Sequence, residues 1–457
     1  MQHSAPRSLA ALGLLSGAGY AAAGFLIPWD DSRLGFALFL GVFLGLSGLW
    51  LAALAIARRR PPRVAFLLGL AIVFRLLLVP AGYDFAGESW QRDFLYDDDV
   101  WRYLWEGHAG AVGLDPLSTP PDALEEYELE LTRPQLHRRL YNEAVWGEIF
   151  DNVSYRQFAS PYGYAAHGVF RIAHTISPGS LLVWKLLMVA FDGGTILLLL
   201  ALCERLSLGT WPVIAYAWNP LVIKELAGSA HLDAILVFFL VAAVYAAVRS
   251  AGKSAGILLA LAALVKPIPV ALSPGFFKRF GWAGVLGPLG ALALLFWHLP
   301  EGMNAYAAYW RFNPALARFL PPGRLWALLL PAAATGAVAL YWYVRDDRSP
   351  RALLSQSLWI LGAFLLTTPM LAPWYLTWIL PFAAMRRAWF WLVLSGTSFL
   401  SYHAYLDMRE HAWVAAIEFG VPLAVWFGRR LRGRHRVTDD TMEPWSSFAE
   451  RRAPHPG

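Results

Sequence analysis

Long apolar runs separated by short polar segments follow one another along most of the chain. The runs at 34–57 and 181–202 approach or exceed the roughly 20 apolar residues that an α-helix needs to cross a bilayer. The pattern therefore predicts an all-α polytopic membrane protein with about 12 transmembrane helices. The predicted spans are residues 8–28, 34–57, 64–82, 181–202, 210–226, 231–249, 281–299, 323–344, 351–369, 373–386, 388–404 and 411–428.

One further apolar segment, residues 254–275, carries Lys266-Pro267-Ile268-Pro269 at its middle. Proline removes a backbone donor and breaks a helix, so two half-helices are expected to meet at this point. Broken backbone at membrane depth is tolerated where it is buried in protein or lines a wet cavity. We therefore predict a re-entrant segment that enters and leaves on the same side, in preference to a single additional span.

Residues 83–179 differ from the rest of the chain because they hold half of its 32 acidic residues. This stretch is too polar to cross a membrane and too long for a passive connection. Its aromatic content predicts short amphipathic helices at 141–149 and 155–175 that lie at the membrane interface. We predict one transmembrane domain, residues 1–436, with 83–179 as its large catalytic outer loop. The polar tail 437–457 is predicted to be disordered and cytoplasmic.

Composition and charge exclude other classes of protein. Only 15% of the 457 residues are charged, whereas a soluble domain carries about 25%. The net charge is +6, but the cations flank apolar runs, as Arg58, Arg59 and Arg60 do. By the positive-inside rule both termini are cytoplasmic and residues 83–180 face outward, which predicts an inner-membrane protein that binds no nucleic acid. Cys203 is the one cysteine, so no internal disulfide or thiolate metal cluster can form.

The densest group of polar residues lies at 97–106, with Asp97, Asp98 and Asp99 ahead of Arg102 and Glu106. In a helix, Asp98, Arg102 and Glu106 would share one face. Neighbouring carboxylates raise each other's pKa, which suits a general base, and their oxygens equally suit a divalent cation. The alternative is a solvated acidic turn that complements a helix dipole.

Other ionisable residues follow at predicted outer turns or within apolar segments. Lys224-Glu225 and His231-Leu232-Asp233 flank the turn between the fifth and sixth spans, on the same side as the acidic loop. Lys266 sits at the predicted helix break, where it either binds an anion in a polar cavity or extends to the interface. Arg311 and Tyr375 lie among aromatic residues, a setting typical of phosphate or sugar sites and of membrane interfaces alike.

In this order the motifs resemble the GT-C superfamily of integral-membrane glycosyltransferases, in particular the bacterial mannosyltransferase-like group that uses polyprenyl-phosphate sugars. The resemblance covers roughly residues 64–405. It implies a GT-C-like helix bundle in which an aspartate of the first large outer loop is the catalytic base. The motifs that carry it are Asp97-Asp98-Asp99-Val100-Trp101-Arg102-Tyr103-Leu104-Trp105-Glu106-Gly107, Gly113-Leu114-Asp115-Pro116, Ser160-Pro161-Tyr162-Gly163, Trp218-Asn219-Pro220-Leu221, His231-Leu232-Asp233, Leu264-Val265-Lys266-Pro267, Trp310-Arg311-Phe312-Asn313 and Pro373-Trp374-Tyr375-Leu376-Thr377-Trp378.

The resemblance implies an inverting transfer of a sugar, mannose by analogy, from a polyprenyl-phosphate donor to a hydroxyl of a lipid or glycan acceptor on the outer face. Asp99 is the first choice for the base, followed by Asp98 and Asp97, and no cofactor is required, although Mg²⁺ or Mn²⁺ fits the carboxylates. The alternative is a transporter or flippase of lipid-linked sugars, which the broken segment would suit. The expected donor- and substrate-binding residues are Arg102, Tyr103, Glu106, Lys224, Glu225, His231, Asp233, Lys266, Arg311 and Tyr375.

Overall fold

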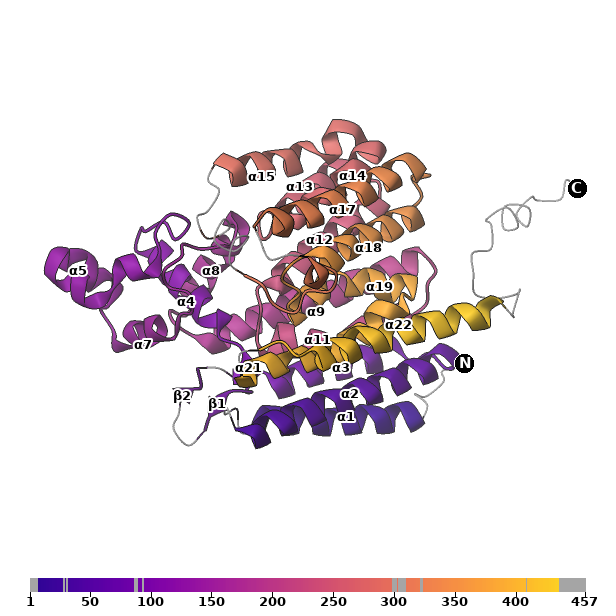
Figure 1. Ribbon diagram of the computed structural model, residues 1–457, viewed down its shortest axis with the longest axis horizontal. Helices are drawn as coiled ribbons and strands as arrows, with labels where there is room; N and C mark the ends of the chain where they lie inside the picture. The colour runs from indigo at the N-terminus through magenta and orange to yellow at the C-terminus, as the bar shows by residue number, and fades with distance from the viewer. Residues whose placement is uncertain are drawn as a thin grey trace, which may run out of the picture.

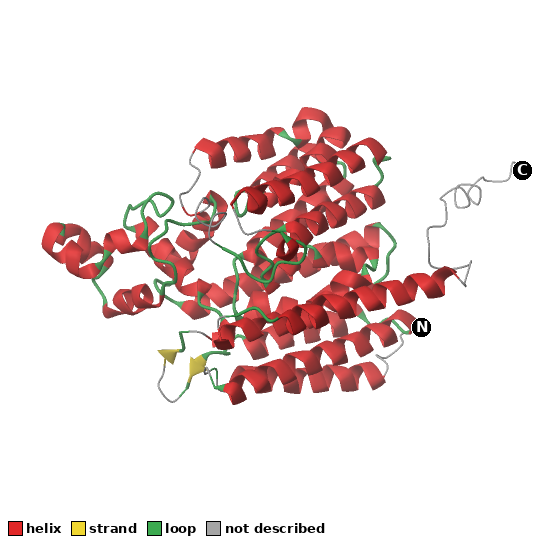
Figure 2. Ribbon diagram, viewed as in Figure 1, coloured by secondary structure: helices red, strands yellow, loops and turns green. Residues whose placement is uncertain are grey.

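Helices form nearly all of the regular structure in the computed structural model, as the sequence predicts (Figure 2). The structure describes residues 7–434 apart from 28, 30–31, 86–88, 93, 298–301, 303–309, 321–323 and 408. Within these residues, β1 (Tyr83–Asp84) and β2 (Ser89–Trp90) form one antiparallel pair in which Tyr83 is opposite Trp90. The predicted tail 437–457 lies outside the described residues.

Four of the described helices are long and apolar enough to cross a membrane. They are α1 (Arg7–Phe25), α2 (Arg33–Arg59), α9 (Leu181–Arg205) and most of α17 (Arg324–Arg345). The number rises to six if two bent pairs of helices each count as one span; the pairs are bent by 119° at 228–233 and by 99° at 284–286. These apolar helices support a membrane protein, and the count of about twelve spans stays a prediction.

Several predicted spans are interrupted because proline or an irregular turn ends the helix early. The predicted span 210–226 consists of α10 (Trp211–Ala217), α11 (Pro220–Ile223) and η3 (Lys224–Gly228). Other helices of the bundle, within the described residues, are α3 (Val64–Leu78), α12 (Asp233–Val248), η5 (Gly281–Gly284), α15 (Leu286–Trp297), η6 (Ala317–Phe319), α18 (Pro350–Thr367), η7 (Pro373–Trp378), α19 (Leu380–Arg386), α20 (Trp389–Thr397), η8 (Ser398–His403), α21 (Ala404–Asp407) and α22 (Ala412–Arg434).

The acidic region 83–179 projects from one end of the bundle, and the start of α1 and the end of α22 lie at the opposite end (Figure 1). The predicted helix 155–175 begins only at Tyr164, because the segment Ser160-Pro161-Tyr162-Gly163 before it is irregular. The helices of this region are η1 (Phe94–Tyr96), α4 (Asp99–Ala111), η2 (Pro121–Leu124), α5 (Glu126–Thr132), α6 (Pro134–Leu140), α7 (Ala144–Asn152) and α8 (Tyr164–Ile176).

The apolar segment 254–275 is broken, as its prolines predict. Helix α13 (Gly252–Ala263) ends before Lys266, and η4 (Ile268–Leu272) and α14 (Ser273–Phe280) follow. The two ends of this segment lie side by side. Gly252, at the start of α13, is so close to Phe280, at the end of α14, that a Cβ atom added at Gly252 would lie 2.8 Å from Cγ of Phe280. The outer region satisfies part of the broken backbone: the N–H of Gly163 donates to the carbonyl of Val265 at 3.1 Å. This contact fixes the acidic region against the break.

Candidate active site

A cavity of about 1610 Å³ opens where the acidic region meets the helix break and the loops before α17, η7 and α22. Its wall combines carboxylates, cations and aromatic rings with apolar residues such as Leu328 and Pro331. The polar and aromatic lining residues include Arg92, Tyr96, Asp97, Asp98, Asp99, Arg102, Tyr155, Arg156, Tyr162, Lys266, Trp310, Arg311, Trp374, Tyr375, Trp378, Tyr405, Arg409 and Glu410.

Asp97 is turned into the protein by an unusual stretch of backbone. Leu95 and Tyr96 both have positive φ angles, of 55° and 57°, which side chains other than glycine rarely adopt. The ring of Tyr96 packs against Phe39 at 5.1 Å between centroids, which holds this conformation in place. Asp97 is therefore buried, and its Oδ2 lies 2.8 Å from Nε2 of His231. Backbone strain of this kind is typical of functional sites.

His231 belongs to a fully buried group of ionisable side chains behind Asp97. Its ring is stacked on Trp374, with 4.2 Å between centroids, and its Nε2 lies 3.4 Å from Oε2 of Glu225. Glu225 also accepts hydrogen bonds from Lys224 at 3.1 Å and from the Tyr402 hydroxyl at 2.8 Å. Lys224 and Glu225 lie on the π-helical turn η3, a distortion frequent at functional sites. The group thus sets Lys224 and the imidazole of His231 against the carboxylates of Glu225 and Asp97.

Asp99 is the first residue of α4 and faces the cavity. Its Oδ2 accepts a hydrogen bond from the Tyr103 hydroxyl at 3.4 Å and lies 3.8 Å from Nδ1 of His231. Burial, reinforced by the negative charge of Asp97, raises the pKa of Asp99 to about 6. Burial also tends to raise the pKa of Asp97, but the positive charge of His231 outweighs this effect, so the pKa of Asp97 is lowered. The two carboxylates are thus separated into a permanent anion and a base that titrates near neutrality.

Lys266 at the helix break lines the cavity. Its Nζ lies 2.9 Å and 3.0 Å from the two carboxylate oxygens of Asp233, and 4.7 Å from the centre of the Tyr375 ring. Trp378 donates to the same carboxylate at 2.5 Å. Asp233 thereby positions the ammonium group, which still lines the cavity together with the exposed Arg311.

Arg102 and Glu106 have protein partners that hold the cavity wall together. The guanidinium of Arg102, which is 4% exposed, bonds Glu106 at 3.0 Å and the carbonyl of Tyr155 at 2.7 Å. Glu106 accepts a hydrogen bond from the Ser160 hydroxyl at 2.8 Å. These contacts fix the segment 154–160, so the structure favours a positioning role for this pair; their predicted contact with the donor stays a prediction.

Of the ten predicted donor- or substrate-binding residues, the structure places Arg102, Lys266, Arg311 and Tyr375 on the cavity wall. The other six are not part of the wall: Tyr103 and His231 contact the aspartates, Asp233 contacts Lys266, Glu106 pairs with Arg102, and Lys224 and Glu225 pair with each other. Sequence reasoning missed Tyr402, which bonds Glu225, and the wall residues Arg92, Arg156, Tyr405 and Arg409. Tyr402, Tyr405 and Arg409 are distant in sequence from the motifs they join, so no local spacing indicates them, whereas Arg92 and Arg156 lie close to the 97–107 and 160–163 motifs without belonging to their pattern.

Asp97, Asp99 and His231 could together hold a metal ion, because one donor atom from each lies within 4.8 Å of the others. Two carboxylate oxygens and one imidazole nitrogen fit Mn²⁺ better than Mg²⁺, which prefers oxygen ligands throughout. Metal binding would replace the contact between His231 and Asp97, so a metal and a protonated His231 are alternatives at this site.

Residues 95–279 match the model of a protein family described as alpha-(1->6)-mannopyranosyltransferase, N-terminal domain. No curated protein and no solved structure matches the chain. The matched segment contains Asp97, Asp99, His231 and Lys266 and ends before Arg311. The matched family is one of mannosyltransferases, which bears out the predicted resemblance to mannosyltransferases and the glycosyltransferase class.

Proposed function

We propose that this glycosyltransferase moves a mannosyl unit from a polyprenyl monophosphate to an acceptor hydroxyl, with inversion, at the outer face of the inner membrane. The single observation that carries the proposal is the convergence of Asp99, Lys266 and Arg311 on one cavity from distant parts of the chain. The family match supports the mannosyl group. The donor and the stereochemistry are those that the family resemblance implies, and the orientation is inferred from the charge pattern of the sequence.

In the proposed reaction the carboxylate of Asp99 takes the proton of the acceptor hydroxyl. The acceptor oxygen forms a bond to the anomeric carbon of the sugar from the face opposite the donor phosphate. The bond from that carbon to the phosphate oxygen breaks, and its electron pair leaves with the polyprenyl phosphate. Lys266 and Arg311 stabilise the charge that develops on this leaving group.

Asp99 is preferred to its neighbours because of what surrounds each carboxylate. Asp97 is committed to His231, and its lowered pKa makes it a weak base. Asp99 has a pKa of about 6, which leaves it ionised at neutral pH and still able to hold a proton. Asp98 also lines the cavity and is the second choice.

The apolar part of the cavity offers a path for the lipid of the donor. One side of α17 lines it, with Leu328, Pro331 and Thr335 spaced by three or four residues. Only 17% of the most apolar stretch of α17 is buried within the protein, so much of this helix is available to lipid. A polyprenyl chain lying along α17 would bring its phosphate to Lys266 and Arg311.

The proposal is tested with purified protein in lipid nanodiscs, supplied with radiolabelled polyprenyl-phosphate mannose and a cell-envelope acceptor fraction. We expect labelled product from the wild type and from Glu130→Gln, which changes an exposed carboxylate on α5, but not from Asp99→Asn. Donor binding, measured separately, should be similar in all three proteins. Normal transfer by Asp97→Asn, Asp98→Asn and Asp99→Asn alike would refute the catalytic role of the motif and favour the transporter.

A further inference from the structure

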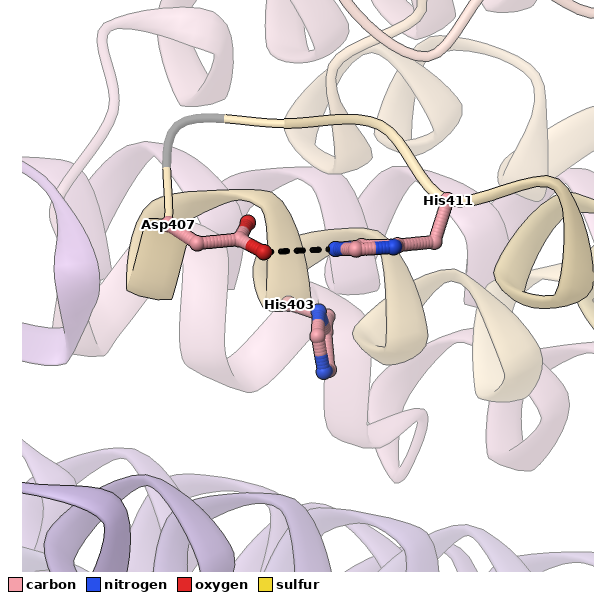
Figure 3. Close-up of side chains that lie close together, drawn as sticks. All are labelled: His403, Asp407 and His411. Atoms are coloured by element: carbon pink, nitrogen blue, oxygen red, sulfur yellow. Dashed lines mark hydrogen bonds and ion pairs between the residues drawn. The ribbon is translucent and has the colours of Figure 1, made fainter.

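A second group of metal-ligating side chains lies apart from the aspartates, at the segment that leads into α22. His403 ends η8, Asp407 ends α21, and His411 immediately precedes α22. Figure 3 shows the carboxylate of Asp407 and the ring of His411 facing each other, with His403 beside them. Nε2 of His411 lies 2.8 Å from Oδ2 of Asp407, and the two imidazole rings are 4.8 Å apart and nearly perpendicular.

The spacing of these donors is close to that of a tetrahedral metal site. One ligand atom from each residue lies within 4.8 Å of the other two. Zinc bonds of about 2.0–2.1 Å at tetrahedral angles place their donors about 3.3 Å apart. Rotation of the side chains, without a new backbone path, would therefore bring the three donors to a common ion. Two imidazoles and one carboxylate are a typical zinc ligand set that leaves a fourth position open.

The environment of the three side chains also favours a ligand. Nδ1 of His403 is buried and has no hydrogen-bond partner in the described part of the chain. A buried polar nitrogen without a partner is unfavourable, and a bound cation would satisfy it. On the other side, 43% of the Asp407 side chain and 30% of the His411 side chain are exposed, so an ion can enter from solvent.

We propose that His403, Asp407 and His411 bind a transition-metal dication, Zn²⁺ by preference, at the rim of the cavity. The segment between the three ligands supplies Tyr405, Leu406, Arg409 and Glu410 to the cavity wall. Glu410 in turn accepts a hydrogen bond from the backbone of Asn313 at 2.6 Å, next to Arg311. The ion would tie the end of η8 to the start of α22 and so fix the rim. This role is independent of the proposed transfer reaction.

The proposal is tested by titrating Zn²⁺ into tag-free protein in nanodiscs and measuring bound metal by equilibrium dialysis. Residues that only hydrogen-bond to a metal ligand already change the metal affinity by about 10–100-fold. Loss of a ligand itself should therefore lower the Zn²⁺ affinity by more than about 100-fold. We expect saturable binding in the wild type and in the control His137→Ala/His174→Ala, which removes two histidines elsewhere. His403→Ala/His411→Ala should lose it, and Asp407→Asn should bind more weakly. No saturable Zn²⁺ binding by the wild type would overturn the proposal.

A spectroscopic readout separates this site from the aspartates. Tetrahedral Co²⁺ with nitrogen ligands absorbs visible light, so Co²⁺-loaded wild type should show bands that His403→Ala/His411→Ala lacks. Asp97→Asn/Asp99→Asn should keep these bands. If that variant loses them and the histidine variant keeps them, the metal belongs to the aspartates and the proposal is wrong. Asp407 and His411 are partly exposed, so the single variants Asp407→Asn and His411→Ala provide the same comparison if the double variant does not fold.

Zn²⁺ should also raise the Tm of the wild type, because a ligand that binds only the folded state stabilises it. The control His137→Ala/His174→Ala should show the same rise and His403→Ala/His411→Ala should show none. An equal rise in the histidine variant would contradict the assignment. Because each readout is independent of sugar transfer, its outcome does not depend on the proposed reaction.

Discussion

Both ends of the acidic motif 97–106 carry carboxylates, but the surroundings of these carboxylates differ. At its start, Asp97 and Asp99 meet His231 from the turn before α12 and face the cavity. Further along α4, Arg102 bonds Glu106 and the backbone carbonyl of Tyr155, and Glu106 accepts a hydrogen bond from Ser160. The first group has a carboxylate with a pKa shifted toward neutrality, and the second is a closed ion pair. Charge density alone therefore does not distinguish a reactive group from a structural one.

The largest effect should come from Asp99→Asn, which keeps the shape of the side chain and removes the proton acceptor. Loss of a general base typically lowers the rate by about 10²–10⁴-fold. Sugar transfer in single-turnover assays should fall by this amount, whereas donor affinity and Tm should change little. A control at the other end of the motif, Glu106→Gln, should not reproduce this pattern. If Asp98→Asn is inactive and Asp99→Asn is not, the base is Asp98.

The opposite pattern is expected for Arg102→Ala. It leaves Glu106 as a buried carboxylate without its cation, and breaking a buried pair typically destabilises a protein by about 3–5 kcal/mol. Thermal unfolding in detergent should show a large decrease in Tm, and Arg102→Lys should recover part of it. The matched control is Arg156→Ala, whose guanidinium is 37% exposed. An unchanged Tm together with lost donor binding would show that Arg102 contacts the donor after all.

Lys266→Ala should weaken donor binding, because the cation nearest the helix break no longer meets the phosphate. A hydrogen bond to a charged group contributes about 1.5–3 kcal/mol, so the Kd for polyprenyl-phosphate mannose should rise by about 10–100-fold. Lys266→Arg should retain part of the affinity. The measurement is donor binding in nanodiscs with Lys253→Ala as control, a lysine next to the α12–α13 turn. Equal donor affinity in wild type and Lys266→Ala would show that Lys266 does not bind the donor phosphate and only pairs with Asp233.

The smallest effect is the pH dependence. Asp99 accepts a proton only when ionised, and its pKa is about 6, so the rate should fall about tenfold per pH unit below pH 6 and level off above it. The charge of Asp97 contributes to this raised value, and Asp97→Asn should therefore move the inflection to lower pH. The readout is the pH profile of single-turnover transfer. An unchanged inflection in Asp97→Asn would show that the charge of Asp97 does not influence the pKa of the catalytic base.

Sequence reasoning succeeds where the physical cause is local. Pro267 and Pro269 end α13 whatever surrounds them, so the broken segment could be predicted without tertiary structure. It is weaker for the number of spans, because helices such as α10 and α11 are interrupted at turns that the hydropathy pattern does not reveal. The positive φ angles at Leu95 and Tyr96 had no signal in the sequence either, since packing on Phe36 and Phe39 maintains them.

The sequence by itself determined that this is a helical protein with membrane-spanning segments, a polar acidic region, and aspartates and a lysine that suit sugar transfer. Composition and the hydropathy pattern are sufficient for the helical and membrane predictions, whereas the link of the aspartates and the lysine to sugar transfer came from the order of motifs that resembles a known family. Only the tertiary structure decided which charges meet. Tyr402 bonds Glu225, which lies 177 residues earlier in the chain. His231 contacts Asp97, which lies 134 residues earlier. The strength of a charge depends on burial and on the nearest opposite charge, and folding brings both together from distant parts of the chain.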